Sequence, residues 1–348
     1  MTRFRLGMLA LTCTGFAIQA GAHHSFSEYD QGHPIELVGK LIDVRWENPH
    51  VHFTLQRTDA SGQTGSWDLE SNSLSILRRT NATPENLKAG QTVKVAGWPS
   101  KRAGNRLFVT NVLQADGQEL VLDLRAKPRW TSVAAGLKTT WFGGATPASG
   151  DVGLFHVWAS DLADPASVFP WKDPSEYPLT DKAKQALAKW DPIRDTVARG
   201  CEPKGMPTII EQPYPIEFVD QHDTILLRME EYDTVRTLHM ASKGPAQVQP
   251  KTRLGYSTGH WEGKTLVVET SRIDWGYFDP SGVPQGSGLS VVEQFTPSAD
   301  GSRLNYTMVV TDSETFTRPV ELHRVWVRRP GEEVKPYNCA SAKARATH

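Results

Sequence analysis

Residues 35–114 alternate apolar and polar side chains in short runs that are separated by turns. A period of two is typical of β-strands that bury one face. Ser73–Arg79 and Pro84–Leu87 have the composition of short helical turns. Five strands with one small helix after the third predict an OB-like barrel over residues 23–125, and an unrelated small sandwich would also fit. The strand runs are Ile35–Trp46, Val51–Arg57, Ser66–Glu70, Thr92–Trp98 and Leu107–Gln114.

The same alternation returns in residues 201–339, at a spacing typical of hairpins. Seven or eight antiparallel strands must close on themselves or pair with a second sheet to hide their edges. The pattern therefore predicts a C-terminal antiparallel β-barrel or sandwich, and the whole fold is mainly β. The runs are Ile209–Phe218, Thr224–Glu231, Val235–Met240, Thr265–Thr270, Val291–Thr296, Leu304–Val310 and Val320–Val327.

Residues 126–200 between these regions are rich in proline and tryptophan. Only Thr180–Lys189 has a helical pattern, with Thr180 and Asp181 as the candidate N-caps. Exposed tryptophans would be costly, so we expect an ordered connecting segment that packs on a neighbouring surface. The tryptophans are Trp130, Trp141, Trp158, Trp171 and Trp190. Residues 340–348 are predicted to form a disordered tail.

The first 22 residues have the pattern of a secretory signal peptide. Arg3 and Arg5 precede a mostly apolar run, and Ala20-Gly21-Ala22 has the small-x-small form of a cleavage site. The apolar run is too short and too interrupted for a membrane span. We therefore expect a mature chain that begins at His23, has no membrane span and is periplasmic or secreted.

Composition narrows the function classes but names no reaction. The 348 residues include 38 Lys+Arg and 39 Asp+Glu, and this balance argues against a general nucleic-acid binder. The length suits two domains with their own cores. No GxGxxG, Walker or HExxH motif occurs in the sequence, which removes support for the usual nucleotide and zincin sites.

Two cysteines remain after removal of Cys13 with the signal peptide. An even pair in an oxidising compartment predicts a disulfide between Cys201 and Cys339. The alternative is two free thiols in a redox or metal site, but neither cysteine lies in a CxxC motif.

Histidines near the predicted mature N-terminus form a candidate metal site. His23 would offer its α-amine and its imidazole to one ion, and His50 and His52 lie two apart on a predicted strand, so they share a face. Such all-nitrogen ligation favours Cu(II). His24 or His33 could add a ligand. The alternative is a set of surface or hydrogen-bonding histidines.

A second candidate site lies in Glu230–His239. A strand, a tight turn and a returning strand would bring one of its glutamates near Arg236 or His239. Asp233, Arg236 and His239 would suffice for acid–base chemistry if they faced one cavity. Strand alternation puts Arg236 and His239 on opposite faces, so they cannot all serve one pocket. The alternative is a salt-bridge ladder on the outside of a barrel.

Glu293 is a further catalytic candidate, because it shares a strand face with Val291 and Phe295. An acid among apolar neighbours is usually paired or functional. A structural hydrogen bond to Tyr306 or Arg324 would explain it equally well.

Aromatic residues supply candidate ligand-binding positions in the C-terminal region. Trp261 and Glu262 lie in a predicted hairpin turn, which could edge a pocket or be a plain turn. Trp275 and Tyr277 precede the Gly/Pro/Ser-rich segment Asp279–Gly288 and could form an aromatic lid over the mouth of a barrel.

Several motifs occur together along the chain: AHHSF at Ala22–Phe26, WENPH at Trp46–His50, CEPKGMP at Cys201–Pro207, EEYDTVRTLHM at Glu230–Met240 and GYSTGHWEGKTLVVET at Gly255–Thr270. With these motifs the chain resembles an uncharacterised family of exported bacterial proteins that carry a domain of unknown function. The resemblance implies export and supports the division into domains, but it leaves the reaction open. His50 lies within a shared motif and His52 does not, which weakens the two-histidine pair.

These features favour an exported two-domain binding protein, with copper at the mature N-terminus and a small molecule in the C-terminal barrel. An alternative is a cofactor-free lyase, isomerase or hydrolase, in which Asp233, His239 and Glu293 act as acid and base while Arg236 holds a substrate anion. A third alternative is an envelope scaffold without a small ligand.

Overall fold

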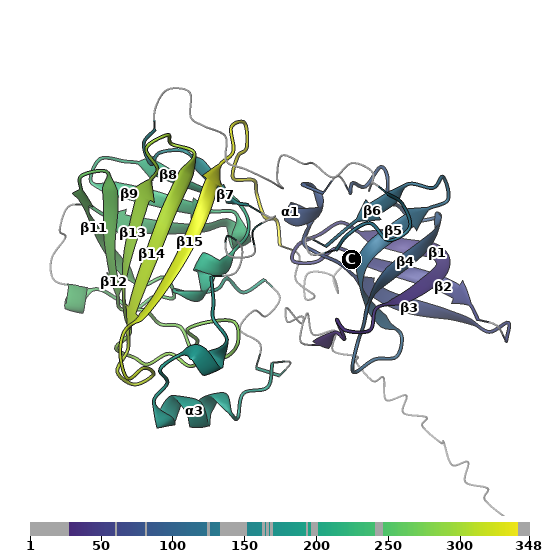
Figure 1. The fold of residues 1–348 in the computed structure, drawn as a ribbon, viewed down its shortest axis with the longest axis horizontal. Helices are drawn as coiled ribbons and strands as arrows, with labels where there is room; N and C mark the ends of the chain where they lie inside the picture. The colour runs from purple at the N-terminus through teal and green to yellow at the C-terminus, as the bar shows by residue number, and fades with distance from the viewer. Residues whose placement is uncertain are drawn as a thin grey trace, which may run out of the picture.

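The protein folds into two β-barrels joined by a connecting segment (Figure 1). The structure is a computed structural model that describes residues 28–59, 61–80, 82–123, 126–132, 152–161, 164, 167, 170–192, 194–195, 201–240 and 246–339. The predicted signal peptide, His23, His24 and the predicted tail lie outside these residues. No helix in the described ranges is long and apolar enough to cross a membrane.

The N-terminal barrel, drawn in purple and blue in Figure 1, has the predicted OB-like arrangement. Its strands are β1 (Ile35–Arg45), β2 (His52–Thr58), β3 (Thr64–Glu70), β4 (Thr92–Pro99), β5 (Arg106–Gln114) and β6 (Glu119–Val121). They follow the order β3-β2-β1-β4-β5-β6, and a parallel pairing of β3 with β5 closes the barrel. Helix α1 (Leu74–Leu77) lies between β3 and β4, whereas residues 84–87 form a turn.

Strand alternation determines which side chains of β2 enter the core. Val51, Phe53 and Leu55 are almost completely buried, while His50 and His52 alternate with them and are only partly buried. The two histidines therefore share the face of the strand that points away from the barrel core.

Gly97 lies where β4 and β5 approach most closely. A Cβ atom there would clash with the carbonyl oxygen of Phe108, and the strand register shifts between Ala96 and Gly97. Only glycine fits such a bulge, which lets the sheet bend into a barrel.

The C-terminal barrel is closed in the order β10-β11-β12-β13-β14-β15-β7-β8-β9. Neighbouring strands are antiparallel except β10 and β11. The strands are β7 (Val157–Ser160), β8 (Ile216–Asp220), β9 (Thr224–Met229), β10 (Thr234–His239), β11 (Tyr256–Glu262), β12 (Thr265–Ser271), β13 (Ser290–Pro297), β14 (Arg303–Thr311) and β15 (Val320–Arg328). The predicted mainly β fold with two β domains is confirmed.

Three local features differ from the prediction. The expected strand Ile209–Phe218 is wrong in its first half, where η4 (Thr208–Glu211) forms a short 3₁₀ helix before β8 begins. Strand β11 was not predicted, because Gly259 and the polar residues around it weaken its apolar alternation. Strand β7 comes from the connecting segment, whose short apolar stretch carries little periodicity.

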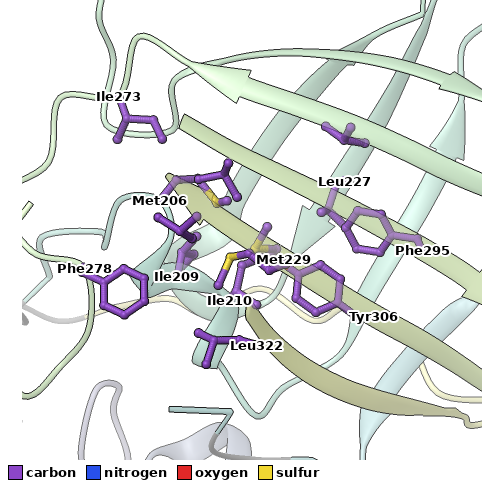
Figure 2. Packing of buried hydrophobic residues seen from close by; sticks show 14 of the residues in the cluster. Met206, Ile209, Ile210, Leu227, Met229, Ile273, Phe278, Phe295, Tyr306 and Leu322 are labelled. Atoms are coloured by element: carbon purple, nitrogen blue, oxygen red, sulfur yellow. The ribbon is translucent and has the colours of Figure 1, made fainter. Parts of the chain in front are cut away.

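The interior of the C-terminal barrel is filled by apolar and aromatic side chains. Leu227, Met229, Phe295 and Tyr306 are at most 2% exposed. Figure 2 shows Ile209 and Ile210 of η4 beside the methionines of this cluster, with Phe278 at its edge. Helix η4 thus closes one end of the barrel, which explains why these isoleucines are buried without belonging to a strand.

The described parts of the connecting segment pack on both barrels. Trp130 Nε1 donates to Glu36 of β1 at 3.1 Å, and the later tryptophans among the described residues contact the C-terminal barrel. Trp158 of β7 is completely buried, and the Trp171 ring contacts Phe278 at a centroid distance of 5.4 Å. Helix α3 (Asp181–Leu187) begins after Thr180, whose hydroxyl accepts a hydrogen bond from the Ala183 amide. Of the two candidate N-caps, Thr180 is therefore the one that the helix uses. Trp141 lies outside the described residues.

The two barrels meet through buried polar contacts, and the predicted disulfide links the two ends of the C-terminal region near this interface. Cys201 and Cys339 are bonded, with 5.7 Å between their Cα atoms. The Arg79 guanidinium donates to both carboxylate oxygens of Glu230, at 3.0 and 2.9 Å. The Tyr214 hydroxyl donates to Ser73 Oγ at 2.9 Å. These contacts join residues distant in the sequence and hold the barrels together.

Candidate functional site

The candidate metal ligand His50 lies just before β2 and is oriented by a backbone carbonyl. Its Nδ1 atom is 2.7 Å from the carbonyl oxygen of Ser71. A carbonyl can only accept, so Nδ1 carries the proton and the lone pair lies on Nε2. Metal-binding histidines commonly donate their second ring nitrogen in this way, which fixes the tautomer and the ring orientation.

Glu70 places a carboxylate beside the two histidines. It is the register partner of His52 in the β2–β3 ladder, so their side chains lie on the same face. Burial raises the pKa of Glu70, and the nearby His50 opposes that rise. The pKa of Tyr29 is raised by burial and by the charge of Glu70, which puts Tyr29 at the same cluster.

Phe108 and its neighbours form an aromatic side to this cluster. The ring of Phe108 stacks on Trp98 at 5.3 Å and meets Tyr29 at 5.6 Å and His50 at 6.5 Å. Strand β5 therefore gives the histidine cluster an apolar wall, which excludes water from one side of it.

Arg106 links the start of the described chain to this face. Its guanidinium contacts Glu28 at 3.3 Å and Asp68 at 3.0 Å, and Glu28 is 2% exposed. Within the described ranges, no three His, Cys, Asp or Glu side chains are arranged to hold a metal ion. Of the candidate ligands, His50 and His52 lie within these ranges, and His23 precedes them in the sequence.

Arg236 and Glu293 form a buried ion pair inside the C-terminal barrel. Arg236 Nη1 donates to Glu293 Oε1 at 3.0 Å, and Nη2 donates to Glu293 Oε2. Arg236 also donates to Ser257 and Thr270, and the Tyr306 hydroxyl donates to Glu293 at 2.9 Å. Both charged side chains are at most 1% exposed. The acid among apolar neighbours is thus held by a complete hydrogen-bond network.

Asp233 and His239 do not join that network. Asp233 is exposed and accepts a hydrogen bond from the Tyr337 amide at 2.9 Å. His239 lies on the opposite strand face from Arg236 and stacks on Tyr256 at 4.8 Å. The four candidate catalytic residues therefore do not converge on one cavity.

The glutamates of Glu230–His239 bind other cations than the expected Arg236 or His239. Glu230 pairs with Arg79, and Glu231 Oε1 lies 3.0 Å from Lys204 Nζ. The intervening turn has positive φ angles at Tyr232 and Asp233, which turns the two glutamates away from β10.

The candidate ligand-binding residues lie near opposite ends of β12. Trp261 is 43% exposed and contacts Phe155 at 6.1 Å, and the exposed Glu262 pairs with His260 at 3.2 Å. Beyond the other end, Trp275 Nε1 donates to Thr208 Oγ1 at 2.9 Å, and Tyr277 is partly buried nearby. They do not line a shared pocket.

The sequence analysis missed the buried Lys204 and considered Arg324 only as a hydrogen-bond partner of Glu293. Lys204 Nζ contacts Glu211 at 2.6 Å as well as Glu231. Burial alone would lower the pKa of Lys204, but the two carboxylates outweigh that effect and raise it. Burial lowers the pKa of Arg324 to about 9, and its guanidinium donates to Ser160 Oγ at 2.6 Å. The burial of Arg324 could have been predicted from the pattern that revealed Glu293, since Arg324 shares a strand face with Leu322 and Trp326 in β15.

Comparison with known proteins finds a family match in the N-terminal part of the chain. No curated protein matches this sequence. A family model covers the predicted metal ligands and extends into β5. Residues 10–109 match the model of a family of unknown function, DUF6152.

Proposed function

We propose that this is an exported metal-binding protein whose N-terminal barrel holds a copper ion through His23 and His50. The observation that carries the proposal is the 2.7 Å contact between His50 Nδ1 and the Ser71 carbonyl, because it presents Nε2 as a ligand atom in a fixed orientation. The α-amine and imidazole of His23 would supply the other nitrogens. Ligation by nitrogen alone favours Cu(II) over other divalent first-row metals.

Neighbouring residues fit a cation at this position. His52 shares the face of His50, and Glu70 provides a carboxylate directly across the ladder from His52. His23 lies only five positions before the buried Glu28, a length of chain that spans at most about 18 Å. Chain length thus keeps the proposed N-terminal ligands within reach of the same barrel.

The proposed copper site requires export, because signal-peptide cleavage creates one of its ligands. The N-terminal amine of His23 exists only after cleavage of the signal peptide, and the Cys201–Cys339 disulfide is of the kind that persists in oxidising compartments. We place the protein in the periplasm or outside the cell.

The packing of the C-terminal barrel fits a structural role better than the binding of a small molecule in its interior. Its axis is occupied by packed aromatic side chains and by the paired Arg236 and Glu293. The enzyme alternative lacks a shared cavity for its acid and base, since Asp233 and His239 lie outside the interior. The binding function is therefore assigned to the N-terminal barrel.

The test is Cu(II) binding to the mature protein after mass spectrometry has established that it begins at His23. We expect one copper with nitrogen hyperfine structure in the EPR spectrum. His50→Ala should weaken Cu(II) binding by at least about 100-fold, because even outer partners of metal ligands are worth about 10–100-fold. One residue added before His23 should have a comparable effect, since it removes the terminal chelate.

His323→Ala is the matched control, because His323 is exposed on the outside of the C-terminal barrel. It should leave Cu(II) affinity unchanged. Absence of copper above background in the wild-type protein would refute the proposal and favour a scaffold. Unchanged affinity in His50→Ala would refute the ligand assignment.

A further inference from the structure

The C-terminal strap, defined as residues 332–339, lies between the two barrels (Figure 1). The backbone amide of Lys335 donates to Glu230 Oε2 at 3.2 Å, and that of Tyr337 donates to Asp233. The Tyr337 ring is 2% exposed. At its end, Cys339 is covalently bonded to Cys201. The strap is therefore attached to the C-terminal barrel by hydrogen bonds and one disulfide.

The other side of the strap holds Asn48 of the N-terminal barrel. Asn48 is completely buried, and its Nδ2 atom donates to the carbonyl oxygen of Tyr337. Its backbone forms a parallel β-bridge with Cys339. The same Nδ2 atom lies 3.5 Å from Ser75 Oγ. One asparagine thus connects the disulfide-bonded end of the strap to the loop that precedes β2.

His50 lies between two anchors of this loop. On its C-terminal side, the Val51 amide donates to the Asn72 carbonyl at 3.2 Å, and the Val51 carbonyl accepts from the Ser71 amide at 2.9 Å. These bonds lie entirely within the N-terminal barrel. On its N-terminal side, two residues away, the anchor is Asn48 and depends on the strap. Only this second anchor is sensitive to the disulfide.

We infer that Asn48 is a positioning residue through which the disulfide-bonded strap orients His50 for metal binding. The inference rests on the proposed metal site. It assigns to the strap a role in metal affinity. With the disulfide present, His50 is held at both ends of its loop, and without the disulfide the N-terminal anchor is loosened. The disulfide-bonded protein is then the form that binds Cu(II) tightly.

Two variants test this inference in the full mature chain. Asn48→Ala removes the side-chain contact with the strap, and Cys201→Ala combined with Cys339→Ala removes the disulfide. Both should weaken Cu(II) binding by about 10–100-fold, as for other outer partners of metal ligands. Both should also change the nitrogen hyperfine pattern in EPR. Circular dichroism measures whether each variant is folded. If the disulfide-free variant does not fold, Asn48→Ala alone tests the inference.

Phe316→Leu is the control for general destabilisation, because Phe316 is buried in the C-terminal barrel among Tyr177 and Phe278. It should leave Cu(II) affinity and the EPR spectrum unchanged. Affinities within about twofold of wild type in the folded strap variants would overturn the inference, since outer partners are worth at least about tenfold.

Hydrogen exchange in the metal-free protein separates this inference from the proposed function. The amides of Asn48 and His50 should exchange at least about tenfold faster in both strap variants than in wild type or Phe316→Leu. Faster exchange in a protein that binds no copper would support positioning by the strap and refute the metal site. Unchanged exchange would refute positioning, whatever the metal does.

Discussion

Replacing Arg236 by alanine should lower the free energy of unfolding by about 3–5 kcal/mol, the usual cost of removing one partner of a buried ion pair. Glu293 is completely buried and would keep only the hydrogen bond from the Tyr306 hydroxyl. Ser257 and Thr270 would lose their guanidinium contacts as well. The measurement is chemical denaturation followed by tryptophan fluorescence.

A double variant distinguishes the cost of an unpaired charge from the worth of the pair. Arg236→Met with Glu293→Leu removes both charges and keeps similar side-chain volume. We expect it to be close to wild type in stability or above it, because apolar replacement of a whole buried pair is often neutral or stabilising. A single variant that loses less than about 1 kcal/mol, or a double variant less stable than the single, would contradict this account.

Glu293 shows what strand periodicity can and cannot predict. Its place on the same strand face as Val291 and Phe295 correctly marked it as an inward-facing acid that needs a partner. The partner Arg236 is 57 residues away in sequence and three strands away around the barrel. Strand order is set by barrel closure, which local patterning does not encode, so the pairing could not be predicted.

The strand limits also divide into those that local alternation predicts and those that depend on long-range pairing. Those with strong alternation, such as β2 and β13, begin and end within two residues of their predicted limits. Strands β7 and β11 are stabilised by neighbours on both sides of a closed barrel, so weak local patterns suffice. Tertiary pairing, which the sequence shows poorly, therefore decides the number of strands.

The candidate metal site was predicted only in part. His50 and His52 share a face as strand alternation requires, but the role of Glu70 depends on the β2–β3 register, and the orientation of His50 depends on the Ser71 carbonyl. Asn48 carries no charge and no periodic signal, and its contact with Tyr337 spans 289 positions. Long-range contacts of this kind become visible only in the folded chain.

Removal of the disulfide should lower the free energy of unfolding by about 5 kcal/mol in the chain-entropy model. The bonded cysteines are 138 positions apart, so the cross-link excludes many conformations of the unfolded chain. Cys201→Ala, Cys339→Ala and the double variant should lose nearly the same stability, because each of them breaks the one bond. Denaturant unfolding of the three variants and of wild type measures the differences.

The three variants also separate the bond from the packing around it. The double variant could instead lose as much unfolding free energy as the two single variants together. Each cysteine side chain would then stabilise the protein through its own contacts, and the cross-link would contribute nothing. A loss below about 1 kcal/mol in all three would show that the strap is held by its noncovalent contacts, with Asp233, Glu230 and Asn48 as the anchors that remain. A common loss near 5 kcal/mol would instead make the disulfide the main constraint on the C-terminal strap.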